Sequence, residues 1–144
     1  MRWPLVIAAS IALGSCSMAN DKGASEQQVA AFHQAYDAQH FEAIYDGSAP
    51  TLKQITPKQQ FLDFLGTVYR NLGRVKAASQ QSWKVNYATG GSGVTLVYET
   101  TFANGTGTET FVYETGANPR LLGYHITSQV PLAPTASQVR KNRS

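Results

Sequence analysis

The chain has 144 residues, of which 42% are hydrophobic, and a formal net charge of +3 at neutral pH. That length is enough for one domain with its own core and too short for two comfortable ones. The positive charge lies at the ends, at Arg2 and at Arg140, Lys141 and Arg143, so the other 8 basic residues face 9 acids. This near-neutral body excludes the clustered basic face of a nucleic-acid-binding protein.

An apolar run of nine residues, 5–13, follows the single basic residue Arg2. It is too short to span a bilayer, which takes about 20 apolar residues, and it is typical of a secretory signal peptide over residues 1–15. The run ends in Leu13-Gly14-Ser15-Cys16, which holds the only cysteine of the chain. This motif resembles the lipobox of bacterial lipoproteins, and the resemblance implies a diacylglyceryl thioether on Cys16 with cleavage before it.

Two processing routes therefore remain open. On the lipid route, the two acyl chains on Cys16 hold the protein durably at a membrane of the bacterial cell envelope, facing the periplasm. Since Ser17 rather than an aspartate follows Cys16, the resemblance favours the outer over the inner membrane. On the alternative route, cleavage after Ser17-Met18-Ala19 releases a soluble periplasmic protein. With Cys16 used, no thiol is left for a disulfide, a thiolate metal site or cysteine catalysis.

The N-terminal half of the mature chain has helical patterns. Residues 16–24 are small and polar and are expected to form a lipidated tether. A capping-box pattern at Ser25 to Gln28 predicts a helix over 26–39. A short helix follows at 41–46. Thr56 as N-cap and Pro57 as the first helical residue predict a long helix that runs to Leu72 and ends at Gly73.

From Val75 the apolar residues alternate, which predicts strands at about 75–88, 94–103, 108–115 and 120–130. Glycine-rich turns separate the strands, and Asn104-Gly105 is a strong hairpin signal. Residue parity puts the apolar side chains of all four strands on one face. The expected cross-strand neighbours are Tyr87 with Val94, Tyr98 with Phe111 or Tyr113, Tyr113 with Leu122, and Phe111 with Tyr124. Residues 131–144 contain two prolines and are expected to be a disordered basic tail.

Helices followed by an antiparallel sheet predict an α+β domain over residues 25–130, with N-terminal helices packed on a curved four-stranded sheet. This order resembles the cystatin-like, or nuclear-transport-factor-two-like, cone. Further features are Tyr45-Asp46, Thr56 to Phe61, Leu72-Gly73, Leu96-Val-Tyr-Glu-Thr-Thr-Phe, Glu109-Thr-Phe-Val and Leu122-Gly-Tyr-His-Ile. Through these features, residues 27–130 resemble a family of uncharacterised bacterial exported proteins. The resemblance implies a fold and brings no catalytic residue with it.

Glu109 is the acid with the clearest chemical potential. Parity places it on the aromatic face with Tyr98, Tyr113 and Tyr124, and these four residues are the candidate pocket. In a cone fold such a carboxylate can act as a general base while phenolic donors stabilise an oxyanion. Alternatively, Glu109 sits at a strand end and reaches water. No second acid or histidine clearly joins it, so no catalytic residue, metal site or cofactor is predicted.

The remaining polar candidates favour structural roles. Glu99 and His125 share the opposite sheet face. They can form a cross-strand pair or an acid–base pair, but the pattern favours a solvated or dimer-forming surface. His33 is expected at the edge of the core, since the three histidines lack the spacing of a zinc site. Tyr69, Trp83, Tyr87 and Tyr98 are candidates to line the mouth of the cone or to pack in the core.

Two functions are compatible with these patterns. The first is a membrane-anchored lipoprotein with a non-catalytic binding or assembly domain, whose partner is an apolar ligand, a second copy or an envelope protein. The second is a small hydrolase- or isomerase-like enzyme that uses Glu109 with the pocket tyrosines.

Overall fold

The structure, a computed structural model, describes residues 14–132, so most of the predicted signal peptide and tail lie outside the described residues. In chain order the elements are α1 (Gly14–Asp37), α2 (Phe41–Asp46), α3 (Pro50–Ile55), α4 (Lys58–Leu72), β1 (Val75–Asn86), β2 (Gly93–Phe102), β3 (Gly105–Glu114) and β4 (Leu121–Ser128). The strands form one antiparallel sheet in the order β1-β2-β3-β4. The predicted α+β class, with helices preceding a four-stranded antiparallel sheet, is confirmed.

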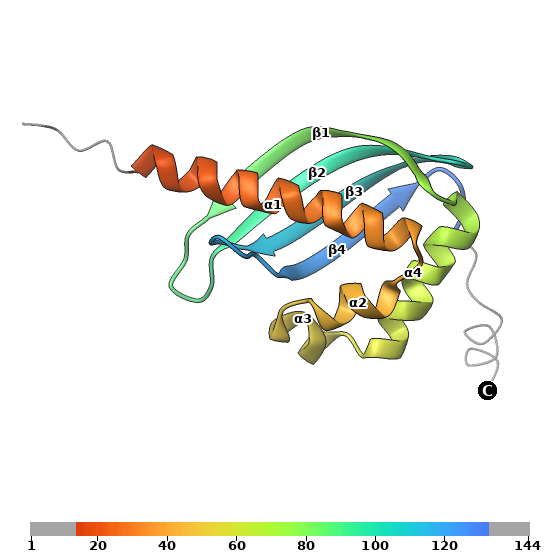
Figure 1. Cartoon of the computed structure of the whole chain (residues 1–144), viewed down its shortest axis with the longest axis horizontal. Helices are drawn as coiled ribbons and strands as arrows, with labels where there is room; N and C mark the ends of the chain where they lie inside the picture. The colour runs from red at the N-terminus through yellow and green to blue at the C-terminus, as the bar shows by residue number, and fades with distance from the viewer. Residues whose placement is uncertain (1–13, 133–144) are drawn as a thin grey trace, which may run out of the picture.

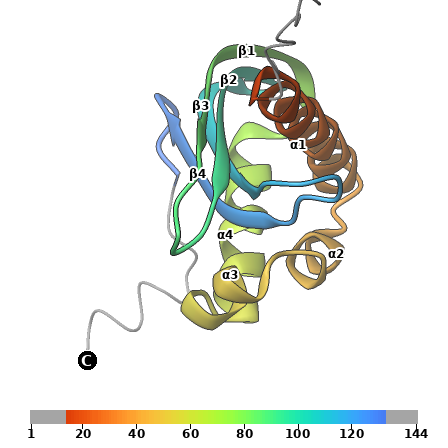
Figure 2. The ribbon, with the colours of Figure 1, turned by 90° about the vertical axis from the view of Figure 1, so that its left-hand side faces the viewer.

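The helices lie on one face of a curved sheet (Figure 1). Seen from the end, the sheet curls around α1, and α4 lies on the same side of it (Figure 2). Apolar side chains recur every three or four residues along α1 and α4, so each helix turns one stripe inward. The core between the layers contains Val29, Phe32 and Tyr36 from α1, Phe61, Leu65, Val68 and Leu72 from α4, and Val94, Leu96, Phe102, Phe111 and Ile126 from the strands.

The predicted end of α4 is confirmed, while its predicted start is wrong by one residue. Gly73 has a φ of 78°, in the left-handed region that favours glycine, and its N–H donates to the carbonyl of Tyr69 at 2.8 Å. At the other end, Pro57 is the N-cap, and no side chain caps the helix. Thr56 is instead the C-cap of α3, where its N–H donates to the carbonyl of Leu52.

Helix α1 begins well before the predicted start, so the capping-box interpretation of Ser25 is wrong. Residues 16–24, expected as a tether, are helical. The reason is a contact that lies far away in the sequence. Asp21 accepts hydrogen bonds from the hydroxyl of Tyr87 at 2.7 Å and from the N–H of Gly116 at 2.8 Å. Because these groups belong to two inter-strand loops, the first turns of α1 are docked on the sheet.

Ser25 is fully buried in the middle of α1, and its Oγ has no hydrogen-bond partner. We expect Ser25→Ala to raise the free energy of unfolding by about 1 kcal/mol, because it removes an unsatisfied hydroxyl and favours the helix. Urea denaturation followed by circular dichroism measures the change. The matched control is Ser48→Ala, because the buried Oγ of Ser48 donates to the carbonyl of Ile44 at 2.7 Å. That substitution is expected to destabilise. If Ser25→Ala instead lowered the free energy of unfolding by about 1 kcal/mol, as the loss of an N-cap does, the assignment of Ser25 to the middle of α1 would be contradicted.

The β2–β3 turn begins one residue before the expected glycine-rich turn, which starts at Asn104. Phe102 pairs with Gly105, which leaves Ala103 and Asn104 as the turn. The N–H groups of these two residues donate to the carbonyls of Arg74 and Leu72, both at 2.9 Å, and so fix the turn on the junction between α4 and β1. With this register, Tyr98 faces Glu109. The expected pairing of Tyr98 with Phe111 or Tyr113 is therefore wrong.

Of the other two hairpins, the first keeps the predicted odd–even pairing near its turn, whereas the last one changes it at one point. Phe111 pairs with Tyr124 as predicted, but an irregularity after Val112 pairs Tyr113 with Leu121 instead of Leu122. In the first hairpin, Val94 pairs with Val85 and not with Tyr87. A shift of two residues keeps each side chain on its face, so the apolar face predicted from parity is confirmed for β2 and β3. On β4 the one-residue irregularity places Leu121, and not the predicted Leu122, in the core.

Within residues 14–132, no helix has both the length and the apolar character needed to cross a membrane.

Candidate functional site

The centre of the site is the carboxylate of Glu109. This residue belongs to β3, and its side chain lies on the face of the sheet that the helices cover. Its side chain is 1% exposed. Its register partners are Tyr98 on β2 and Ile126 on β4, so the residue lies within the paired part of the sheet. The alternative in which Glu109 reaches water at a strand end is therefore wrong.

Three side chains from different elements donate hydrogen bonds to this carboxylate. Oε2 accepts from Thr100 Oγ1 at 2.5 Å and from His33 Nε2 at 2.7 Å. Oε1 accepts from the hydroxyl of Tyr124 at 2.7 Å. An ionised carboxylate only accepts, so all three partners act as donors and Nε2 carries a proton. A buried charge is strongly destabilising unless it is paired in this way.

His33 joins the site from α1 and is the partner that the sequence analysis missed. Its side chain is 12% exposed, and its ring lies edge-on to Phe111 and Phe32. The expected position at the edge of the core is confirmed, whereas the expectation that no histidine joins Glu109 is wrong. A signal was present in the pattern. An acid on the apolar face of a strand needs a donor, and His33 was the histidine on the apolar face of a helix.

The tyrosines around Glu109 are held in their neutral form. Burial, and secondarily the negative charge of Glu109, raise the pKa of Tyr36, Tyr113 and Tyr124 well above its ordinary value. The hydroxyl of Tyr36 also donates to the carbonyl of Gly73 at 3.0 Å. At neutral pH these phenols can therefore donate hydrogen bonds but carry no charge.

The four candidate pocket residues share one region but differ in their contacts. Only Tyr124 contacts the carboxylate of Glu109 directly. The rings of Tyr98 and Tyr113 pack against Phe111, with centroid distances of 6.0 and 6.2 Å. The hydroxyl of Tyr98 accepts a hydrogen bond of 3.4 Å from Gln80. The structure thus surrounds Glu109 with packed side chains.

A groove of about 550 Å³ lies beside this region, between α3, α4 and β4. Its volume falls within the range of small-molecule sites, about 300–1,000 Å³. Tyr124 lines it, so one residue both contacts Glu109 and borders the groove. The other lining side chains are mainly apolar: Leu52, Ile55, Phe61, Phe64, Leu122 and Leu132.

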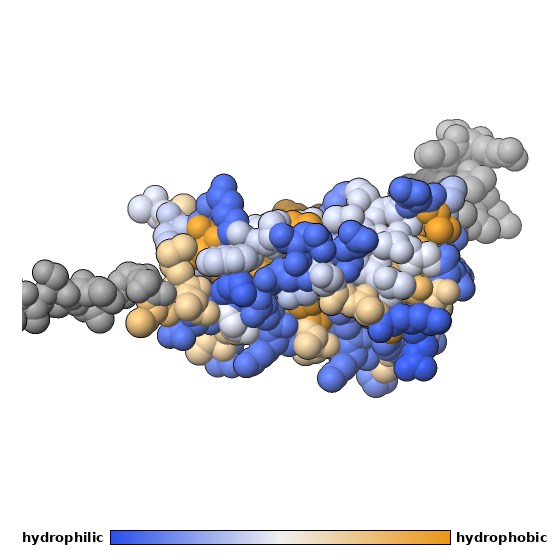
Figure 3. All heavy atoms as spheres, turned by 90° about the horizontal axis from the view of Figure 1, so that it is seen from above, coloured by the Kyte–Doolittle hydropathy of each residue, from blue (hydrophilic) through white to orange (hydrophobic). Residues whose placement is uncertain are grey.

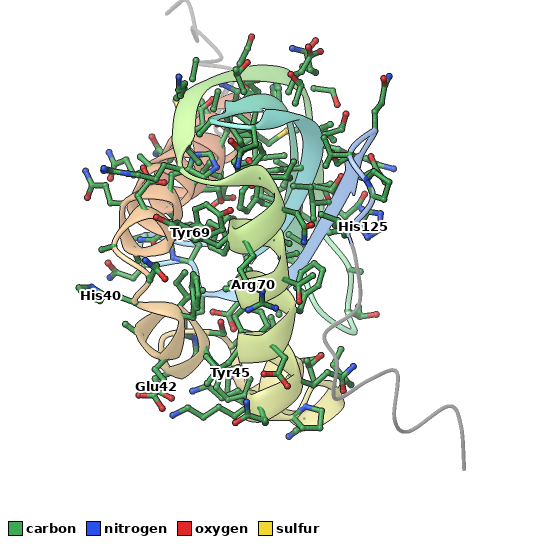
Figure 4. All side chains as sticks on the ribbon, turned by 90° about the vertical axis from the view of Figure 1, so that its right-hand side faces the viewer. His40, Glu42, Tyr45, Tyr69, Arg70 and His125 are labelled. Carbon is green, nitrogen blue, oxygen red and sulfur yellow. The ribbon has the colours of Figure 1, made fainter. Side chains whose placement is uncertain are left out.

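Glu99 and His125 lie on the outer face of the sheet and do not form a cross-strand pair. Glu99 on β2 faces Thr108, and His125 on β4 faces Thr110, so β3 lies between them. Figure 4 shows His125 on the side of β4 away from the helices, whereas Tyr69 points toward α1. Tyr69 packs against Tyr36 with a centroid distance of 5.3 Å.

No group of three or more histidine, cysteine, aspartate or glutamate side chains in the described part of the chain could hold a metal ion. Cys16 lies in the first turn of α1 and is exposed. No protein-family model matches this chain, and no curated protein matches it in sequence.

Proposed function

We propose that this chain is a lipid-anchored protein of the bacterial cell envelope whose α+β domain binds an apolar ligand or partner segment without catalysing a reaction. The proposal that the domain is not catalytic rests on one observation: the carboxylate of Glu109 is enclosed. Both of its oxygens are engaged by Thr100, His33 and Tyr124, and its side chain is 1% exposed. A general base must instead reach a proton of the substrate.

The anchor part of the proposal rests on the motif Leu13-Gly14-Ser15-Cys16. Ser17 after the cysteine favours the outer membrane, with the domain facing the periplasm. Radioactive palmitate is expected to label the wild-type protein and not a Cys16→Ala variant. Equal labelling of the two proteins would contradict the anchor.

The groove between α3, α4 and β4 is the proposed binding surface. Ile55 lines it and is 73% exposed, so its side chain can be changed without disturbing the core. In the Cys16→Ala protein, we expect Ile55→Gln to weaken binding of the apolar dye N-phenyl-1-naphthylamine several-fold, measured by fluorescence titration. The matched control is Ala30→Gln, which adds the same polar group to an exposed position of α1. Equal dye binding by both variants would contradict the groove as the binding surface.

The second candidate function is the small enzyme, and one observation favours it. Tyr124 connects the pair of His33 and Glu109 to the groove. If that connection is functional, occupancy of the groove by the dye shifts the NMR resonances of the His33 imidazole. We expect no such shift, because the carboxylate is enclosed in the binding domain that we propose.

A further inference from the structure

Exposed apolar side chains gather at the end of the domain where α1 begins. Four large apolar residues in the described part of the chain are exposed, and three of them belong to this end: Met18, Trp83 and Tyr87. Trp83 lies at the end of β1, and Tyr87 follows that strand. Figure 1 shows the first turns of α1 extending past the sheet here, and Figure 3 shows apolar atoms next to the departing grey trace.

Contacts with α1 define this surface, which we name the aromatic end (Met18, Trp83 and Tyr87). The ammonium group of Lys22 lies 5.5 Å from the ring centroid of Trp83. The hydroxyl of Tyr87 donates to Asp21, which also accepts from the N–H of Gly116. Both rings are therefore held beside the helix, with exposed fractions of 42% for Trp83 and 53% for Tyr87.

The same helix carries the proposed lipid attachment site. Cys16 and Asp21 lie in one continuous helix, and five residues at 1.5 Å each place them about 7.5 Å apart along its axis. The polar layer on each side of a bilayer is about 5–8 Å thick, the difference between its total and hydrocarbon dimensions shared over two leaflets. Acyl chains on Cys16 would therefore hold the aromatic end within the depth of the lipid headgroups.

We infer that the aromatic end is a membrane-contacting surface, whose partner is the headgroup layer of the bilayer that holds the lipid on Cys16. This inference rests on the proposed lipid anchor. Tryptophan and tyrosine are the residues enriched at membrane–water interfaces, where an apolar ring with a polar edge fits the headgroup level. Trp83 and Tyr87 have this character, and Met18 adds an apolar side chain.

The charges at this end decide which lipids the surface needs. Asp21 is engaged by Tyr87 and Gly116, and Glu26 is paired with Lys22 at 2.5 Å. Lys84, which is exposed next to Trp83 on β1, is a single cation, so these groups contain no cluster of cations that would require anionic headgroups. The contact therefore depends on the aromatic rings and forms on a zwitterionic membrane.

Tryptophan fluorescence tests the contact directly. The chain has two tryptophans, Trp3 and Trp83, and the mature lipoprotein would keep only Trp83. The lipidated protein is reconstituted into phosphatidylcholine vesicles that contain brominated lipid, after intact-mass measurement of its N-terminus. Trp83 is expected to emit at shorter wavelength and to be quenched by the bromine atoms.

The control moves the reporter to the opposite end of the sheet. Thr106 is exposed and lies next to the β2–β3 turn, so the double variant Trp83→Phe with Thr106→Trp places its indole away from the aromatic end. Quenching of wild-type Trp83 is expected to exceed that of the control several-fold. Equal quenching in protein of confirmed lipid mass would overturn the membrane contact and leave the anchor intact. An unmodified N-terminus would overturn both.

Discussion

Glu109→Ala is expected to lower the free energy of unfolding by about 3–5 kcal/mol, because it removes the acceptor at the centre of a buried hydrogen-bond network. The substitution leaves the donors of His33, Thr100 and Tyr124 without their acceptor in a site with almost no access to water. Urea denaturation at neutral pH, followed by circular dichroism, measures the loss. Glu109→Gln is expected to be milder, at about 1–3 kcal/mol, because its amide keeps one acceptor oxygen.

The control for this prediction is the glutamate of β2, on the opposite face of the sheet. Glu99 lies on the exposed outer face of β2, so Glu99→Gln is expected to stay within about 0.5 kcal/mol of wild type. The double variant His33→Leu with Glu109→Leu replaces the hydrogen-bonded pair by apolar groups. It should therefore recover part of the stability lost in Glu109→Ala. An unchanged urea midpoint in Glu109→Ala would show that the carboxylate does not hold α1 on the sheet.

Raising the pH above about 10 is expected to lower the free energy of unfolding by about 4 kcal/mol per pH unit. Tyr36, Tyr113 and Tyr124 have pKa values raised by burial in the folded protein. Their phenol protons are retained when the unfolded chain would lose them, so stability is complete below the unfolded pKa of about 10 and falls above it. Each proton contributes about 1.4 kcal/mol per pH unit, and the three add up to the stated slope.

Tyr113→Phe provides the control for the alkaline slope. The substitution keeps the ring that stacks on Phe111 and removes only the ionisable hydroxyl. The slope is expected to fall by about one third, or 1.4 kcal/mol per pH unit. Urea midpoints measured below and above pH 10 give the slope of the free energy of unfolding against pH. The ultraviolet absorbance of phenolate shows when the tyrosines ionise. An unaltered slope in this variant would show that Tyr113 ionises in the folded protein as readily as in the unfolded one.

Most of the fold could be predicted from the sequence. The change from helical to alternating periodicity at Val75 marked the order of helices and strands, because side chains repeat every 3.6 residues in a helix and every two in a strand. Parity placed Leu96, Phe111 and Tyr124 on one face, and the structure confirms it. Errors of two residues in a hairpin left this face unchanged, because the period of a strand is two.

The site was predicted only in part. Glu109 and Tyr124 were placed together on the apolar face, and the structure joins them by a hydrogen bond. His33 was missed because it lies 76 positions from Glu109 in the chain, a separation over which periodicity carries no information. Ser25 was misassigned because a capping-box pattern looks the same whether it starts a helix or lies inside a longer one.

The class of the domain, the number and order of its strands and most of the face that becomes the core follow from local patterns in the chain. These features depend on apolar spacing and turn residues, which act over a few neighbouring positions. Two features depend instead on long-range contacts. Glu109 is enclosed by His33, Thr100 and Tyr124, and α1 continues through Asp21. Both outcomes depend on the desolvation of charged groups, and the donors that stabilise those charges come from distant parts of the chain.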